Sequence, residues 1–215
     1  CVLSTTSCFA PRVPDDVEQI AKLCAENGEI AHVINNAYGL QCSKICHKIN
    51  MACRNGQVDA VVQSTDKNLL VPVGGAIIAG PNKRFIEEEI SRTYSGRASM
   101  SPILDVFITL IHLGKNGLTE LRERRIRLIT YFQTALEKIA IKYGERLLDT
   151  GQKNTISFAV TLNRLGDENQ EEVTRFGSMV FTRGISGSRV VSKRMSKTVA
   201  GTSFEGYGAS YSNYH

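Results

Sequence analysis

The sequence predicts an α/β fold with a mainly parallel sheet, because short apolar segments alternate with a helical one. Ile30–Ile34 and Val58–Val62 are apolar runs of strand length, and each is followed closely by polar residues. A helical pattern over Leu40–Ala52 lies between them, and Gly75–Gly80 has the pattern of one further strand. A strand, a helix and a second strand in this order are typical of parallel strands joined by a crossover.

The other elements are predicted from start signals and apolar spacing. Cys1–Thr6 has the pattern of a strand, and a helix begins after Pro14-Asp15-Asp16. Helical patterns then cover Asn82–Arg92, Pro102–Leu113 and Leu118–Tyr143. We expect further strands near Ile156–Thr161, Met179–Thr182 and Ile185–Val191. The change of pattern predicts part of a large domain over residues 1–145 and part of a small α+β domain over residues 146–215.

The composition is ordinary for a globular protein. Of 215 residues, 42% are hydrophobic and 22% are charged. No apolar run reaches the length of a membrane span, and the chain starts without Met or a basic leader. We therefore expect a cytoplasmic location and interpret the chain as a fragment of a longer protein.

The cysteines do not indicate a metal site. Cys42, Cys46, His47 and Cys53 are close in sequence, but the chain has no Cys-x-x-Cys pair. Cys42 and Cys46 are one turn apart on an expected helix, where free cysteine packs as a small apolar residue. We expect reduced thiols and no bound metal.

Lys67 is the strongest candidate for chemistry. It follows the strand that ends at Gln63 and precedes an apolar stretch and the pair Gly74-Gly75. A lysine held between buried strands is desolvated, which favours the neutral amine and Schiff-base chemistry. Proteins anchor pyridoxal 5'-phosphate (PLP) in this way. An isolated lysine is more often an exposed loop residue, so the interpretation depends on its neighbours.

Asn35 provides the second half of this prediction. It directly follows the strand Ile30–Ile34 and begins the segment Asn35-Asn36-Ala37-Tyr38-Gly39. In open α/β sheets ligands bind at the carboxyl ends of strands. Asn35 and the segment Ser64–Lys67 are therefore expected to converge on one ligand, although a plain turn at Asn35 is the alternative.

Four ordered motifs carry a resemblance over nearly the whole chain. They are NNAYG at 35–39, QSTDKN at 63–68 with the following LVPVGGAIIAGPN, YSGRAS at 94–99, and GSMVFTR at 177–183 with ISGSRVV. Together they resemble the O-phosphoseryl-tRNA(Sec) selenium transferase family, SepSecS, within the fold type I superfamily of PLP-dependent enzymes. The resemblance implies conversion of phosphoseryl-tRNA(Sec) to selenocysteinyl-tRNA(Sec) with selenophosphate, by elimination of phosphate followed by addition of selenium. It also implies a homo-oligomer, a tetramer in the family.

The resemblance assigns roles to single residues. Lys67 would hold PLP and exchange protons at the substrate, and Asn35 would contact the pyridine nitrogen where many relatives of the fold have Asp. Ser64 would bind the cofactor phosphate, with capping of the turn as the alternative. Arg97 would bind the phosphate of phosphoserine, for which a planar guanidinium is suited. Arg183 would face the tRNA, and a surface ion pair is the alternative for Arg97.

The charge distribution is consistent with a polyanionic partner. The net charge is +5, and the stretch from Val173 to Phe204 holds six basic residues and no acidic one. A solvated basic face would give the same pattern. The alternatives to a SepSecS-like enzyme are another fold type I enzyme, such as a cysteine desulfurase or a decarboxylase, and a non-catalytic tRNA-binding fragment.

Overall fold

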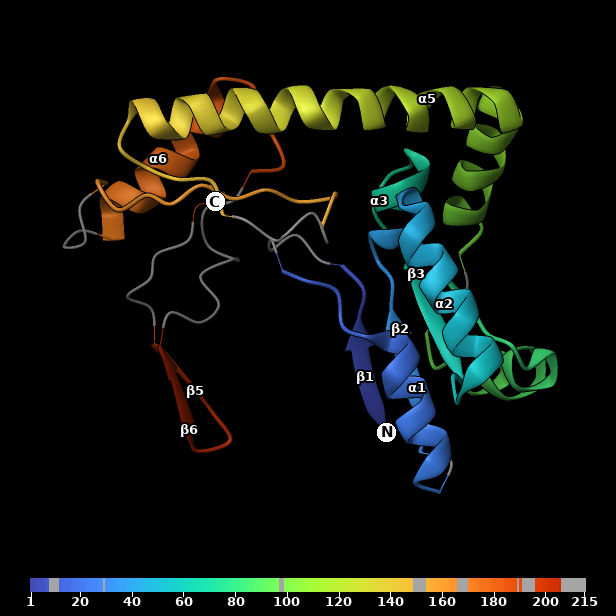
Figure 1. Ribbon diagram of the computed structural model, residues 1–215. Helices are drawn as coiled ribbons and strands as arrows, with labels where there is room; N and C mark the ends of the chain where they lie inside the picture. Colours follow the sequence, from blue (N-terminus) through green and yellow to red (C-terminus); the bar gives the residue numbers. More distant parts are fainter. Residues whose placement is uncertain are drawn as a thin grey trace. The chain divides into compact units, whose positions relative to one another are not determined.

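The first part of the chain forms an α/β structure with a four-stranded sheet (Figure 1). The computed structural model describes residues 1–7, 12–28, 30–96, 99–148, 154–165, 170–188, 190 and 196–205. The sheet has the order β1 (Val2–Thr5), β2 (His32–Asn35), β3 (Ala60–Ser64) and β4 (Ala76–Ala79). The first three strands are parallel and β4 is antiparallel to β3. The predicted α/β class with a mainly parallel sheet is confirmed.

Because β1, β2 and β3 are parallel and in register, their carboxyl ends lie together on one side of the sheet, across the strand direction. We call this side the carboxyl edge. Thr5 pairs with Asn35, and Asn35 pairs with Val62. Because the strands are parallel, the segments that follow them all leave at this edge.

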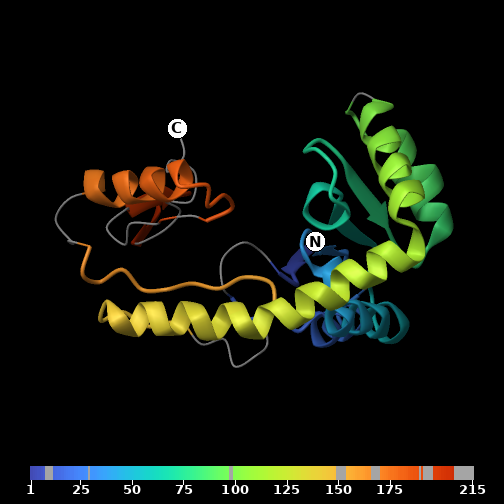
Figure 2. The ribbon, with the colours of Figure 1, turned by 90° about the horizontal axis from the view of Figure 1, so that it is seen from above.

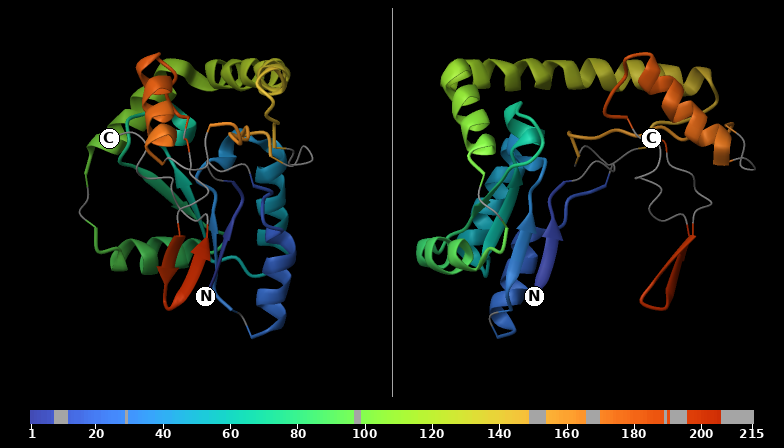
Figure 3. Two further views of the ribbon diagram at one scale, coloured as in Figure 1. Left: turned by 90° about the vertical axis from the view of Figure 1, so that its left-hand side faces the viewer. Right: turned by 180° about the vertical axis from the view of Figure 1, so that it is seen from behind.

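Two helices cover one face of the sheet. They are α1 (Val17–Glu26) and α2 (Ser43–Asn55), the latter preceded by the short helix η1 (Gly39–Gln41). Figures 2 and 3 show both helices on the same side of the strands. The buried core between these layers consists of Val17, Ala21, Ile34, Ala52 and Val58. Burying a larger aliphatic side chain of this kind contributes about 1.5–3 kcal/mol.

A close approach joins α1 to the end of α2. The backbone N–H of Gln57 donates to the carbonyl oxygen of Ala21 at 2.9 Å. A Cβ at Gly56 would lie 2.4 Å from the carbonyl carbon of Ala21, so only glycine fits there.

The later elements are mainly helical. They are α3 (Asp66–Leu69), the π-helix η2 (Phe85–Ile90), α4 (Ser91–Thr93), α5 (Ser101–Lys142) and α6 (Gln170–Thr182), followed by the hairpin β5 (Ser196–Val199) and β6 (Thr202–Glu205). The two helices predicted over 102–113 and 118–143 are both present within α5, which is kinked between them at Gly114 with the non-helical angles φ 59° and ψ −174°. Within the described ranges, no helix is long and apolar enough to cross a membrane.

Contacts divide the chain into two compact units. One comprises Cys1–Lys138 and Leu147–Ala159, and the other comprises Ile139–Arg146 and Val160–His215. The first unit holds the four-stranded sheet, and the second holds α6 and the β5–β6 hairpin. The domain limits 1–145 and 146–215 stay a prediction.

The strand predicted at Met179–Thr182 is wrong, because these residues end α6. The better-buried positions of this helix, Val173, Phe176, Gly177 and Val180, have the three- and four-residue spacing of a helix. Read alone, the short apolar run Met179–Phe181 does not distinguish a strand from one helical turn.

The strand predicted at Ile156–Thr161 is reduced to a single bridge at Val160, beside which the backbone N–H of Thr161 donates to the Arg146 carbonyl oxygen at 3.0 Å and that of Leu148 donates to the Ala159 carbonyl oxygen at 2.8 Å. The Asn154 side-chain oxygen accepts the backbone N–H groups of Ile156 and Ser157 at 2.8 and 3.1 Å. These donors are therefore used in a local turn. Of the strand predicted at Ile185–Val191, residues 185–188 and 190 are not in a strand, and the others lie outside the described residues.

Candidate active site

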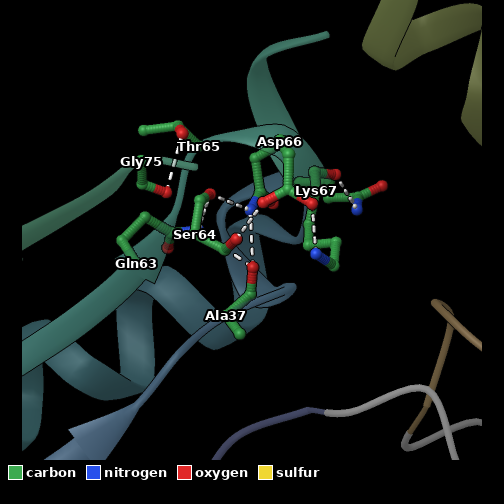
Figure 4. Close-up of polar contacts among 9 residues, drawn as sticks. Ala37, Gln63, Ser64, Thr65, Asp66, Lys67 and Gly75 are labelled. Atoms are coloured by element: carbon green, nitrogen blue, oxygen red, sulfur yellow. Dashed lines mark hydrogen bonds and ion pairs between the residues drawn. The ribbon is translucent and has the colours of Figure 1, made fainter. Parts of the chain in front are cut away.

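Lys67 lies on a short turn of helix that follows β3 directly. The helix α3 has four residues, and Leu70 ends it in the left-handed conformation with φ 57°. The backbone N–H and the hydroxyl of Thr65 both donate to the carbonyl oxygen of Gly75, at 3.2 and 2.8 Å (Figure 4). Since a single helical turn is not stable alone, these bonds and the side-chain contacts described next hold it.

The Lys67 amine is paired but remains accessible. It forms an ion pair with Asp66, whose other oxygen accepts from the Ser64 hydroxyl. The nitrogen lies 5.9 Å from the ring centroid of Tyr38, a cation–π contact. The Lys67 side chain is 35% exposed. The expected enclosure of this lysine between buried strands is therefore wrong, because the chain turns into α3 before reaching it.

Asp66 is held as a carboxylate by its two neighbours. Partial burial acts against the charged form, but hydrogen bonds from Lys67 and Ser64 and the charge of Lys67 outweigh it. The pKa of Asp66 is consequently lowered. Because the Ser64 hydroxyl donates to Asp66 here, its contact in this structure orders the turn.

Asn35 ends β2, the strand beside β3. Its side-chain oxygen accepts the backbone N–H of Ala37 at 3.1 Å, which bends the chain away from the strand. The loop that follows reaches the lysine turn, because the Gln41 side chain donates to the Lys67 carbonyl oxygen at 3.2 Å. Asn35 and Lys67 thus follow neighbouring parallel strands at one edge of the sheet.

Side-chain amides join the strand ends, and the sequence reasoning missed them. The Thr6 hydroxyl donates to the Asn36 side-chain oxygen at 2.6 Å, and the Asn36 amide donates to the Gln63 side-chain oxygen at 2.7 Å. Gln63 and Asn68 both donate onward to backbone carbonyl oxygens. The available signal was the density of Asn and Gln directly after two apolar strands.

Two buried polar atoms at this edge are unsatisfied. Within the described part of the chain, the Ser7 hydroxyl, which follows β1, and the Asn68 side-chain oxygen have no hydrogen-bond partner. A buried polar group without a partner is unfavourable and often marks a place that a ligand or water completes. The edge therefore combines an accessible amine with open hydrogen-bonding groups.

The structure describes one of the two predicted arginines. Arg97 lies outside the described residues. Arg183 is exposed at the end of α6, where its guanidinium donates to the Met179 carbonyl oxygen at 3.2 Å. This contact satisfies a carbonyl at the end of the helix, which is an ordinary structural role for an arginine.

Two other features do not contribute to the site. A hollow of about 580 Å³ is lined by Gly56–Asp59 and Pro81–Phe85, at the opposite edge of the sheet from Lys67. No group of three or more His, Cys, Asp or Glu among the described residues is placed to hold a metal ion. Cys42, Cys46 and Cys53 are free thiols.

The fold is similar to that of solved structures of other proteins. A crystal structure of Oryza sativa TDC with PLP superimposes with a TM-score of 0.57 at 16% sequence identity, over 94% of this chain and 42% of that one. At this identity the likeness concerns the fold alone. The fold type expected from the sequence is confirmed.

The family is defined more closely by sequence. The model of the family O-phosphoseryl-tRNA(Sec) selenium transferase, SepSecS, matches residues 1–215. The chain belongs to this family, as the sequence motifs predicted. The O-phosphoseryl-tRNA(Sec) selenium transferase of Dictyostelium discoideum is 50% identical over 228 residues, covering 100% of this chain and 47% of the relative.

A solved structure agrees with this assignment. The crystal structure of archaeal O-phosphoseryl-tRNA(Sec) selenium transferase has a TM-score of 0.72 and 34% identity, over 86% of this chain and 40% of that one. The chain spans about half the length of the curated relatives it matches.

Proposed function

We propose that this chain is the lysine-bearing part of a PLP-dependent selenium transferase of the cytoplasm. The whole enzyme converts O-phosphoseryl-tRNA(Sec) to selenocysteinyl-tRNA(Sec) with selenophosphate and acts as a homo-oligomer. Family membership supports the reaction. The observation that carries the role of this chain is the junction of the Asn35 loop and the Lys67 turn at one edge of the sheet.

The residues at this edge fit PLP. The Lys67 amine is accessible for covalent attachment, and the Asn35 carboxamide has an unused N–H₂ within the described contacts. The unsatisfied Ser7 hydroxyl lies at the end of the next strand. When bound, PLP withdraws electrons from the substrate carbon next to the amine.

Each residue then has a distinct task. Lys67 anchors the cofactor and moves a proton at the substrate α carbon, and Asp66 orients its amine before attachment. Asn35 donates to the ring nitrogen. Ser64 orders the turn through Asp66 and can turn its hydroxyl to the cofactor phosphate. Arg97 binds the substrate phosphate through a bidentate pair of hydrogen bonds.

The basic residues near the end of the chain supply the tRNA contacts, with Arg183 among them. Phosphate contacts of this kind bind without reading sequence and weaken with salt. The exposed guanidinium of Arg183 can reach such a phosphate, because its bond to Met179 uses one of its five donors.

The test is Lys67→Ala in the full-length enzyme. We expect formation of selenocysteinyl-tRNA to be abolished while the Kd for tRNA stays within about twofold, because the basic residues of the second unit supply most of that binding. Lys83→Ala is the control, since Lys83 is an exposed lysine at the opposite edge and pairs with Glu87 at 3.8 Å. Retained turnover in Lys67→Ala would remove Lys67 from its role.

A further inference from the structure

The carboxamide of Asn68 joins the lysine turn to the loop after β2. Its nitrogen donates to the carbonyl oxygen of Ala37 at 2.7 Å and to that of Ser64 at 2.9 Å. Ala37 belongs to the loop that begins at Asn35, and Ser64 is the last residue of β3. One side-chain group therefore uses both of its N–H donors to hold two strand ends together.

The backbone of Ala37 connects this contact to Asn35. Its carbonyl oxygen accepts from Asn68, and its N–H donates to the Asn35 side-chain oxygen at 3.1 Å. Asn35 and Asn68 are thus connected through a single residue. Figure 4 shows Ala37 and Ser64 close to the Lys67 turn, with hydrogen bonds that converge there.

A second carboxamide, that of Gln63, donates hydrogen bonds to the same two carbonyl groups. The Gln63 side-chain nitrogen donates to the carbonyl oxygen of Ala37 at 3.3 Å and to that of Ser64 at 3.2 Å. Gln63 is buried. These bonds are longer than those of Asn68. Asn68 is therefore the closer bridge, and only Asn68 lies on α3 beside Lys67.

We propose that Asn68 is a positioning residue for Lys67. It fixes the turn that carries the amine against the loop that carries Asn35, and so sets the spacing between covalent anchor and ring contact. This inference rests on the proposed function. The four-residue α3 ends in a left-handed Leu70, so it depends on outside bonds for its shape.

The cost of an unpaired oxygen supports this assignment. Asn68 keeps its side-chain oxygen buried without a partner among the described residues. A buried acceptor left unpaired is unfavourable, whereas an alkyl side chain would avoid it. The two donor bonds offset this cost, and they explain why a carboxamide and not an apolar side chain stands next to Lys67.

The test measures cofactor capture by the unliganded full-length enzyme. Wild type, Asn68→Ala and Asn68→Asp are mixed with PLP, and the rate of the absorbance change and the fraction fixed to Lys67 by borohydride are followed. Asn68→Asp keeps the shape but turns an oxygen towards the two carbonyl groups. We expect both variants to capture PLP about tenfold more slowly, because both hydrogen bonds that Asn68 donates to the two strand ends are lost.

Turnover separates positioning from simple stability. Both variants should lower kcat while KM for phosphoseryl-tRNA changes little, because the lysine moves relative to the ring and the tRNA contacts do not. Asn82→Ala is the matched control: its side-chain oxygen accepts from Phe85 at 3.1 Å at the opposite edge, so it removes one hydrogen bond far from Lys67. If Asn68→Ala does not fold, Asn68→Ser, which keeps a short donor, takes its place.

The possible outcomes are distinct. If Asn68 variants capture PLP and turn over as the wild type does, with only a lower melting temperature, the positioning role is wrong. If the wild type itself is not fixed on Lys67 by borohydride, the proposed function fails instead. Slower capture together with a lower kcat, and no change in Asn82→Ala, supports the positioning role.

Discussion

The side-chain oxygen of Asn35 accepts a hydrogen bond from the backbone N–H of Ala37 at 3.1 Å. In a carboxamide only the oxygen can accept a hydrogen bond. The bond from Ala37 therefore fixes which end of the Asn35 side chain faces the backbone. The nitrogen, which is purely a donor, is left to face a ligand. In the proposed site, an N–H donor at Asn35 would pair with an unprotonated ring nitrogen, whereas the Asp that many fold type I enzymes have there pairs with a protonated one.

The first prediction concerns the protonation of that ring. Because Asn35 presents an N–H, the pyridine nitrogen of bound PLP should be unprotonated. The measurement is the ¹⁵N chemical shift of ¹⁵N-labelled PLP in the full-length enzyme. Wild type should show an unprotonated ring nitrogen, and Asn35→Asp should show a protonated one, since a carboxylate favours the charged ring. Asn82→Asp is the control, and a protonated ring in wild type contradicts the prediction.

The second prediction concerns the ion pair of Asp66. The pKa of Asp66 is lowered in the folded protein by hydrogen bonds and the charge of Lys67, which outweigh partial burial. A lowered folded pKa gives stability above the unfolded pKa, and this stability is lost as the pH falls through the folded pKa. Asp66→Asn should therefore lower the free energy of unfolding at pH 7 by about 0.5–1 kcal/mol, discounted for the exposure of Lys67.

The pH dependence checks the sign of this effect. The difference between wild type and Asp66→Asn, measured by urea denaturation without cofactor, should shrink below about pH 4, where an unfolded Asp is protonated. Glu88→Gln serves as control, because it removes an exposed pair with Arg84 at 3.2 Å and should change the stability less. A difference that is constant from pH 7 to pH 4 and below would show that the charge of Asp66 is not responsible.

The third prediction concerns Arg97, whose placement lies outside the described residues. If Arg97 binds the phosphate of phosphoserine, Arg97→Ala should weaken binding of phosphoseryl-tRNA by about 2–5 kcal/mol. Arg97→Lys should also bind phosphoseryl-tRNA more weakly, because lysine keeps the charge but cannot form the bidentate contact. Binding of uncharged tRNA should change little in both variants.

A salt series distinguishes this role from a backbone contact. A residue that binds the tRNA backbone would weaken both ligands equally and reduce the dependence of affinity on salt. Equal losses for phosphoseryl-tRNA and uncharged tRNA would place the phosphoserine pocket elsewhere. Arg92→Ala is the control, since Arg92 is an exposed arginine on the nearby α4.

The edge of the sheet could be predicted from the sequence for a simple physical reason. Two apolar strands that each end in polar residues, with a helix between them, are parallel neighbours, and their carboxyl ends must meet. This reasoning put Asn35 and Lys67 after neighbouring parallel strands, and the structure has Asn35 at the end of β2 and Lys67 on the helix that follows β3. It did not find that Asn68 bridges the two loops, because that contact depends on the three-dimensional approach of Ala37.

The errors have local causes. The expectation that Lys67 is enclosed assumed that the apolar segments on either side of it bury the side chain, whereas the Asp66 and Ser64 contact turns the chain into α3 and leaves the amine accessible. The strand expected at Met179–Thr182 followed from a short apolar run, although the spacing over the whole of α6 is helical. In both cases the prediction used only a few residues, and residues outside that stretch determined the structure.

The most direct measurement of the central claim is the site of covalent attachment of PLP. The full-length enzyme is incubated with PLP, reduced with borohydride and digested, and the modified peptide is identified by mass spectrometry. Attachment at Lys67, lost in Lys67→Ala and unchanged in Lys83→Ala, is the expected result, because of these two lysines only Lys67 lies at the carboxyl edge, where the loop after Asn35 contacts its turn. Attachment at another lysine, with Lys67 unmodified, would contradict the assignment of this edge as the cofactor site.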